Sequence, residues 1–333
     1  MTQRPRISVV IPTRDRPDYL RTCLEGFAAQ TELRDSFEVI VVDDGSAEPL
    51  DALAVAFEGR LDLRIERRPP DGVSAARNVG ITLARGDFLI LFDDDQCPVP
   101  DMVAHCLTFH EASPDEEDFL LLRLVADTSA PRPPESFAMF EGGLFLRYPA
   151  PGERRGHNVF WGGAVSCKKS VFRYGLYDPD YTAIEDAELG LRISQLLALT
   201  DHYDAARVDA IQSRTLTTRA LLMRWCRMSY FHLLWQRNYP QLVTTGQMQV
   251  YRDAQTSIDR AAPMQETLAA LEAESTSIGA LATESITPPQ QAALARYVTG
   301  MRGAVEHAQA LGWLGARRDA PLETVLEEAF GPA

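Results

Sequence analysis

The sequence predicts an α/β fold: a mostly parallel sheet flanked by helices, followed by a C-terminal helical extension. Apolar runs of strand length alternate with segments of helical periodicity in the N-terminal part of the chain, and polar turns follow three of these runs. Alternating strands and helices require right-handed crossovers, which place helices on both faces of a parallel sheet. We expect strands at 7–11, 37–42, 61–67 and 88–92, and helices at 19–30, 50–57 and 74–84.

The first two elements show both periodicities. Residues 7–11 are rich in Ile and Val, and Pro12 ends the run because proline has no amide hydrogen to donate. Asp18 is placed to cap the following helix, whose apolar residues recur on one face. These residues are Leu20, Leu24 and Phe27. A strand followed by an amphipathic helix is the unit from which such sheets are built.

The later elements repeat this order. The apolar run 37–42 ends in an Asp-Asp-Gly-Ser turn, 50–57 has helical spacing, and 61–67 has the length of a short strand. The Ala-rich segment 74–84 indicates a helix, and the apolar run 88–92 follows a Gly-Asp turn. The pattern therefore predicts successive crossovers within one sheet.

Composition limits both the architecture and the function. A chain of 333 residues exceeds a typical single domain, so we expect a large α/β domain at 1–215 and a helical accessory domain at 216–333. The net charge of −14 argues against a general nucleic-acid binder. Five cysteines without a CxxC pair predict reduced thiols and a cytoplasmic protein. No apolar stretch approaches the ~18 residues that span a bilayer.

Three consecutive carboxylates, Asp93, Asp94 and Asp95, follow the apolar run 88–92. Such acids repel one another, and desolvating them costs several kcal/mol each unless a cation or strong donors compensate. Hard oxygen ligands of this kind suit Mg²⁺ or Mn²⁺, and such an ion keeps positions open for substrate phosphates. The alternative is an acidic loop in solvent.

Polar turns converge at one edge of the predicted sheet. In parallel sheets, ligands bind beyond the carboxyl ends of the strands. The segments 12–14, 43–45 and 93–95 all lie at such ends. The sequence has no GxGxxG after its first strand and no GxxxxGK[ST], so it lacks both a dinucleotide fingerprint and a P-loop.

Five motifs in this order resemble family 2 glycosyltransferases of the GT-A fold, over roughly residues 5–215. The resemblance implies an inverting, non-processive transferase that uses a nucleoside-diphosphate sugar and a divalent metal ion, Mn²⁺ or Mg²⁺. The motifs are Val9-Val10-Ile11-Pro12-Thr13, Val41-Val42-Asp43-Asp44-Gly45-Ser46, Gly72-Val73-Ser74-Ala75-Ala76-Arg77-Asn78, Asp93-Asp94-Asp95 and Ile184-Glu185-Asp186-Ala187-Glu188-Leu189-Gly190-Leu191-Arg192.

The resemblance implies a D-x-D pair for the donor's phosphates. Asp95 is the expected direct metal ligand, and Asp93 faces either the ribose or a metal-bound water, or ligates the metal itself. Asp94 is able to substitute in either role. A metal that bridges the two phosphates stabilises the departing negative charge as a Lewis acid.

The nucleotide pocket is expected to include Pro12, Thr13 and Arg14. Asp44 resembles the acid that accepts a hydrogen bond from the base ring; the alternative is that 43–46 only forms an Asx turn. Arg77 lies in a helix that starts at the crevice, so it is expected to contact the nucleotide or diphosphate. A surface salt bridge is the alternative for Arg77.

Asp186 is the expected general base, because an acceptor hydroxyl must lose its proton as it attacks. Glu185 would bind the acceptor or orient that base. Acids in a first helical turn also complement the helix dipole, which is the structural alternative. The segment Trp161-Gly162-Gly163 stands where the family holds its acceptor, although Trp161 also suits a hydrophobic core.

Two positions depart from the family pattern. Gln212 stands where many relatives carry a histidine that is able to ligate the metal, so metal affinity or choice would differ. Processive members carry Gln-x-x-Arg-Trp, but here Leu221 precedes Arg224-Trp225 in place of Gln. The second departure favours addition of a single sugar.

The segment 210–251 contains no acid but several arginines and aromatic residues. One interpretation is a surface that meets anionic lipid or a phosphate-bearing acceptor, as a peripheral membrane contact. The favoured alternative is that these arginines pack on the acidic transferase domain. The arginines are Arg214, Arg219, Arg224, Arg227 and Arg237.

These observations together predict a glycosyltransferase that uses a UDP- or dTDP-sugar. Its acceptor would be a glycan, a lipid-linked intermediate or a small molecule, and the C-terminal helices are candidates for homo-oligomer contacts. Two other functions are compatible with the pattern: a nucleotide-sugar binding protein without turnover, and a nucleotidyltransferase. The latter needs a Gly-rich basic loop after the first strand, which Pro12-Thr13-Arg14-Asp15 does not resemble.

Overall fold

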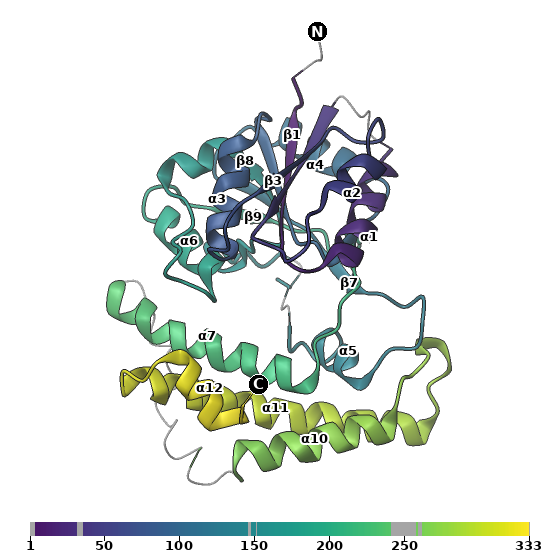
Figure 1. The fold of residues 1–333 in the computed structure, drawn as a ribbon, viewed down its shortest axis with the longest axis vertical. Helices are drawn as coiled ribbons and strands as arrows, with labels where there is room; N and C mark the ends of the chain where they lie inside the picture. Colours follow the sequence, from purple (N-terminus) through teal and green to yellow (C-terminus); the bar gives the residue numbers. More distant parts are fainter. Residues whose placement is uncertain are drawn as a thin grey trace. The chain divides into compact units, whose positions relative to one another are not determined.

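The computed structural model describes residues 4–31, 36–145, 148–150, 152–240, 258 and 262–332 (Figure 1). The chain falls into two compact units. The first comprises Met1–Ala126 and Tyr148–Arg214, and the second comprises Asp127–Arg147 and Thr215–Ala333. The segment Asp127–Arg147, which the sequence analysis placed in the transferase domain, thus groups with the C-terminal helices.

The first unit contains a seven-stranded sheet in the order β3-β2-β1-β4-β8-β6-β9. Strands β1, β2, β3 and β4 pair in parallel, while β8 is antiparallel to both β4 and β6. The α/β prediction is therefore confirmed. The bounds are β1 Ile7–Thr13, β2 Phe37–Asp43, β3 Leu63–Arg67, β4 Phe88–Phe92, β6 Asp118–Leu121, β8 Ala164–Lys168 and β9 Thr200–His202.

Strands β1 and β2 lie at the centre of the parallel part, and every residue in them is buried. Burial on both faces explains why their sequences are continuous Val- and Ile-rich runs without polar alternation. The helices of this unit include those predicted, shifted by one to a few residues at their ends. They are α1 Pro17–Ala28, α2 Asp51–Ala56, α3 Val73–Leu83, α4 Met102–Ala112 and α6 Glu185–Ser194, with 3₁₀ turns η2 Gly156–Val159 and η3 Lys169–Tyr174.

Helix α1 begins differently from the prediction. Its N-cap is Arg16, and Pro17 occupies the first turn, where a missing amide hydrogen has no cost. Asp18 is therefore not the cap, but it lies in the first turn, where a carboxylate complements the helix dipole. This start leaves Arg16 at the junction between the first strand and the helix.

A second, three-stranded sheet borders the carboxyl end of β4. It consists of β5 Gln96–Pro98, β10 Ala210–Gln212 and β7 Leu124–Ala126 in the order β5-β10-β7. Gln212 of β10 pairs with Gln96 of β5, the residue that directly follows the three aspartates. This pairing brings the end of the first unit, Ser213 and Arg214, to the same place.

The second unit is helical, with a core of its own. Its helices are α5 Pro134–Met139, α7 Thr218–Asn238, α10 Met264–Ile278, α11 Pro288–Arg317 and α12 Leu322–Phe330, with the 3₁₀ turn η4 Thr283–Ser285. Helices α7 and α11 approach closely at Gly312, since glycine has no side chain there. A Cβ at this position would clash with the Cys226 carbonyl. Residues of α5, α7, α10, α11 and α12 share one hydrophobic cluster.

Three arginines of α7 contact other parts of the second unit. Arg219 donates to the Phe330 carbonyl, Arg224 lies 4.9 Å from the ring centroid of Phe145, and Arg237 pairs with Asp319. The rest of the acid-free segment, beyond residue 240, lies outside the described residues. None of the described helices combines the length and apolarity that a bilayer span requires.

Candidate active site

The carboxyl ends of β1 and β4 meet through a hydrogen bond between predicted site residues. Thr13 Oγ1 donates to Asp94 Oδ2 at 2.6 Å. Asp94 is 0% exposed, and burial raises its pKa to about 7 despite the opposing influence of Arg16. Asp94 therefore points into the protein interior, where its hydrogen bond with Thr13 fixes the end of β1. This leaves Asp93 and Asp95 as the more accessible acids of the run.

Two guanidinium groups that the sequence analysis did not include in the donor site contact Asp95. Arg16 Nη1 lies 3.2 Å from Asp95 Oδ2 and 3.1 Å from Asp94 Oδ1, and Arg214 Nη1 lies 3.8 Å from Asp95 Oδ2. Burial and the charge of Asp93 raise the pKa of Asp95. The only sequence signals were positional: Arg16 directly precedes α1, and Arg214 follows Gln212 by two residues.

Gln212 lies beside Asp95, as its place in the sequence suggested. Its Nε2 donates to the Asp95 carbonyl at 3.2 Å, while its buried Oε1 has no hydrogen-bond partner among the described residues. A buried amide oxygen without a partner is a vacant acceptor that a cation is able to satisfy. Gln212 thus adds a neutral oxygen to the acidic run.

This donor set fits a divalent ion that prefers oxygen. It consists of the Asp93 and Asp95 carboxylates and the Gln212 amide oxygen, without sulfur or imidazole. Within the described ranges, no three His, Cys, Asp or Glu side chains are grouped so that they would hold a metal on their own. The residues therefore suit an ion that takes further ligands from a substrate, as Mg²⁺ commonly does with phosphates.

Arg77 forms the centre of a buried charge network. Its side chain is 5% exposed; Nη2 donates to Asp93 Oδ1 at 3.0 Å and Nη1 to Glu185 Oε1 at 2.7 Å. Burial alone would lower the pKa of Arg77, but the charge of Asp93 and its acidic neighbours raises it. Arg77 is thus a buried bridge rather than a surface salt bridge, and it connects the acids after β4 to the acids of α6.

Asp186 and Glu185 begin α6, directly after a residue in a left-handed conformation. Ile184 has φ +57°, which is unfavourable for a β-branched side chain. Asp186 Oδ2 accepts from the Gly162 amide at 3.2 Å, and its Oδ1 accepts from the Ala187 amide. Burial, together with the charge of Glu185, raises the pKa of Asp186 to about 6. Ionised above this pH, the carboxylate is then suited to accept a proton.

The two glycines before β8 allow the acids to approach. A Cβ at Gly163 would clash with the Asp93 carboxylate, and a Cβ at Gly162 would lie 2.9 Å from the Arg77 guanidinium. Trp161 is half-buried, and its ring centroid lies 5.4 Å from that of Tyr148 in an edge-on arrangement. Its indole therefore belongs partly to the core, as the sequence alternative allowed.

Asp44 holds the chain that leads into α3. Its Oδ1 accepts from the Asp71 amide and its Oδ2 from the Gly72 amide, both at 2.9 Å. Gly72 has φ +90°, which allows this turn. Asp43 makes the Asx-type contact considered as an alternative, since its Oδ1 accepts from the Ser46 amide at 2.8 Å.

The structure separates the remaining predicted nucleotide-binding residues. Pro12 is buried in β1, where it pairs with Val42. The Arg14 side chain is 53% exposed, and its Nε lies 3.7 Å from Asp15 Oδ2. Arg14 is therefore far less constrained than Arg16, which makes the direct contacts with the aspartates.

The mostly parallel sheet and its flanking helices form a GT-A fold, which the solved structures described below share. The model of glycosyl transferase family 2 matches residues 8–147 of this chain. The structure resembles that of TarS 1–349 from S. aureus, with a TM-score of 0.54 and 13% identity over 94% of this chain and 92% of TarS 1–349. It also resembles the mannosyltransferase PcManGT from Pyrobaculum calidifontis, solved with GDP-Man and Mn²⁺, with a TM-score of 0.55 and 18% identity over 96% and 89%.

Curated relatives share only part of their length with this chain. The putative glycosyltransferase EpsH of Bacillus subtilis is 32% identical over 127 residues, which are 38% of this chain and 35% of EpsH. Hyaluronan synthase of Pasteurella multocida is 40% identical over 100 residues, which are 29% of this chain and 10% of the synthase. The family match over residues 8–147 includes β1 to β4 and the three aspartates.

Proposed function

We propose that the protein is an inverting glycosyltransferase that moves one sugar from a UDP- or dTDP-linked donor to an acceptor hydroxyl. The observation that carries this proposal is the Arg77 bridge, which joins Asp93 to Glu185 beside Asp186. The bridge places the aspartates that would bind the metal and diphosphate in the same site as Asp186, the carboxylate that would accept the proton. Solved structures of TarS with UDP and UDP-GlcNAc, and of PcManGT with GDP-Man, support a nucleotide-sugar donor.

On the donor side, Asp93, Asp95 and Gln212 Oε1 would hold Mg²⁺ or Mn²⁺. The ion would supply positive charge to the departing diphosphate. Arg16 and Arg214 add two permanent positive charges next to Asp95. Asp44 would orient the base while holding Asp71 and Gly72, since a carboxylate has lone pairs beyond those two contacts. Thr13 fixes Asp94, and with Pro12 and Arg14 it would border the nucleotide.

On the acceptor side, Asp186 removes the proton from the acceptor hydroxyl as that oxygen bonds to the anomeric carbon. The bond from this carbon to the donor's phosphate oxygen breaks in the same displacement, and its electron pair leaves with the diphosphate. A single displacement inverts the configuration at that carbon. Glu185, held by Arg77, would orient the acceptor, and the Trp161 indole beside Gly162 and Gly163 would border its ring.

Addition of a single sugar is proposed because Leu221 stands where processive members carry Gln. A glycan, a lipid-linked intermediate and a small molecule are all acceptors with a suitable hydroxyl. A cytoplasmic location, a peripheral membrane contact through 214–237 and a homo-oligomer through the C-terminal helices stay predictions. The proposed reaction depends on none of them.

The metal assignment is tested with a chelator and with Asp95→Ala. We expect EDTA to abolish both transfer and donor hydrolysis, and Mn²⁺ or Mg²⁺ to restore them. Asp95→Ala should lose both activities while its melting temperature is preserved, because the substitution removes a buried carboxylate with a raised pKa. Undiminished turnover after chelation would contradict the assignment. Donor binding without any transfer in the metal-loaded wild type would favour a binding protein instead.

The base assignment predicts a pH dependence. Because the pKa of Asp186 is raised to about 6, the base is protonated below this pH and ionised above it. We expect the single-turnover transfer rate to rise about tenfold per pH unit below pH ~6 and to level off above it. A rate measured under donor and acceptor saturation that stays flat from pH 5 to pH 8 would contradict the role of Asp186.

A further inference from the structure

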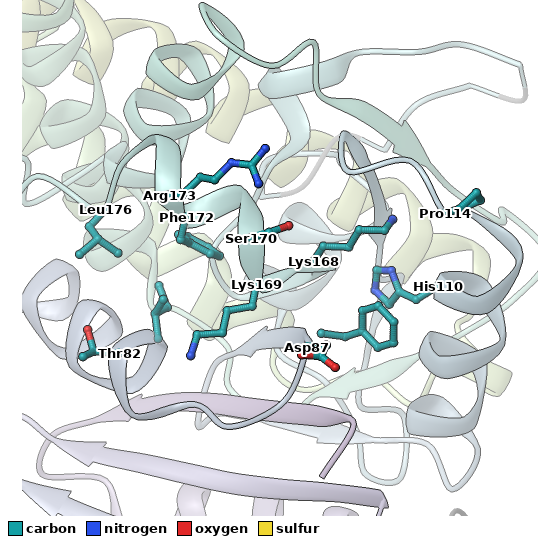
Figure 2. Close-up of a pocket in the computed structure, with 12 residues that line it drawn as sticks. Thr82, Asp87, His110, Pro114, Lys168, Lys169, Ser170, Phe172, Arg173 and Leu176 are labelled. Atoms are coloured by element: carbon teal, nitrogen blue, oxygen red, sulfur yellow. The ribbon is translucent and has the colours of Figure 1, made fainter. Parts of the chain in front are cut away.

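A cavity of about 750 Å³ lies at the opposite end of β4 from the three aspartates (Figure 2). Its lining comes from α3, the start of β4, the end of α4, the end of β8 and η3. The volume falls within the range of small-molecule sites in proteins. Because Phe88 lines the cavity and Asp93 follows the other end of the same strand, this cavity is separate from the proposed transfer site.

The cavity contains the only lysines of the chain. At every other position where the chain has Lys or Arg, the residue is arginine. Lys168 and Lys169 are neighbours in the sequence, and both line the cavity. Figure 2 shows their side chains extending in different directions. Lys168 Nζ donates to the Asp115 carbonyl and Lys169 Nζ to the Ala84 carbonyl. In the described part of the chain, neither ammonium forms an ion pair with a carboxylate.

Other charged residues of the lining already have partners. Arg173 pairs with Glu116, and Asp87 pairs with Arg4. Burial lowers the pKa of Lys168, while the charge of Asp118 opposes this effect. An anion in the cavity would favour the charged form of both lysines. The cavity therefore has positive charge that remains available to a ligand, in a protein with a net charge of −14.

The remaining lining surface is mostly apolar. Ile81, Phe88, Phe172 and Leu176 contribute hydrocarbon, and Leu176 is 40% exposed although it is a large hydrophobic residue. An apolar chain that covers this surface would gain roughly 25 cal/mol for each Å² removed from water. A small inorganic anion would leave this surface uncovered.

We propose that this cavity binds a single-chain alkyl phosphate monoester. The alkyl chain covers the apolar lining and the anionic oxygens accept hydrogen bonds from Lys168, while Lys169, whose side chain extends in another direction, adds positive charge to the lining. A neutral amphiphile lacks the charge, and an ionised fatty acid offers fewer anionic oxygens than a phosphate does. The same chemistry is offered by a free lipid phosphate and by the head group of phosphatidic acid in a membrane.

The test is calorimetric titration of the full chain with monomeric dodecyl phosphate. We expect saturable binding with one site, and no comparable binding of dodecyl maltoside or inorganic phosphate. Leu176→Glu places a negative charge in the apolar lining and should weaken binding at least tenfold. Leu196→Glu is the matched control, because Leu196 is 68% exposed in the same unit and does not line the cavity. Lys168→Gln with Lys169→Gln should weaken binding similarly.

Amine labelling provides a second readout that needs no substitution. Since the chain has only two lysines, mass analysis of proteolytic peptides separates their modification from that of the N-terminal amine. Dodecyl phosphate should slow labelling of both lysines and leave the N-terminal amine unaffected. Vesicles of phosphatidylcholine with phosphatidic acid identify the source: protection of the lysines by monomers alone indicates a free ligand, and protection by both indicates a membrane head group as well. Absent lysine protection, equal binding of dodecyl maltoside, or equal weakening by Leu196→Glu would overturn the proposal.

Discussion

Asp186→Asn is expected to reduce the transfer rate about 10²–10⁴-fold, the range that general base catalysis supplies. The amide keeps the size of the side chain and one of its two backbone contacts, that with the Gly162 amide, but it does not accept a proton. Folding should not suffer. The pKa of Asp186 is raised to about 6 in the native state, so stability is lost as the pH rises from the ordinary aspartate pKa of about 4 to about 6, and the full cost is present at pH 7. The free energy of unfolding at pH 7 should therefore be unchanged or higher.

Three measurements distinguish this result from a general defect. Donor affinity, measured by titration with the nucleotide sugar, should be retained, because Asp186 acts on the acceptor. The acidic limb of the pH profile should disappear from any residual rate. Asp180→Asn is the matched control, since Asp180 is an exposed acid in the same acidic stretch. Full transfer by Asp186→Asn would show that another group serves as base.

Arg77→Gln is expected to produce the second large effect, on stability and activity together. Arg77 is 5% exposed, and its removal leaves Glu185 and Asp93 without their shared counterion. Breaking a buried ion pair from one side costs roughly 3–5 kcal/mol, and we expect the lower end because Asp93 is 39% exposed. The loss of position at Glu185 should reduce transfer about a hundredfold beyond any loss of folded protein. Chemical unfolding and the specific rate per folded molecule measure the two effects.

A double-mutant cycle isolates the bridge. Combining Arg77→Gln with Glu185→Gln removes both partners, so the free energy of unfolding should fall by less than the sum of the single effects. Arg64→Gln is the control for loss of an arginine, because the Arg64 side chain is 52% exposed on β3. An Arg77→Gln protein with wild-type stability would contradict the idea that this guanidinium holds the site together.

The sequence predicted the sheet well because its strands are buried on both faces. Continuous apolar runs at β1, β2 and β4 leave little choice of local structure. The acids after β4 were found for the same reason, since carboxylates directly after buried strands need a chemical explanation. The short strands β5, β7 and β10 were not predicted, because three residues carry no usable periodicity.

The partners of the site residues were harder to predict than the residues themselves. Asp44 contacts the amides of Asp71 and Gly72, and Arg16 contacts two aspartates some eighty positions away. These contacts depend on tertiary pairing of strand ends, which single-sequence patterns do not contain. Arg77 was predicted to contact the ligand because it lies near a helix start, yet its observed partners are protein carboxylates.

The segment Asp127–Arg147 interrupts the first unit in sequence but groups with the C-terminal helices. This arrangement has a consequence for folding during synthesis. Ala138, Met139 and Leu144 join a hydrophobic cluster whose other members lie after residue 220. On the ribosome this apolar segment emerges long before its partners are synthesised, so it stays exposed and prone to aggregation until those partners have emerged. A protein truncated after Arg214 would remain permanently in that condition.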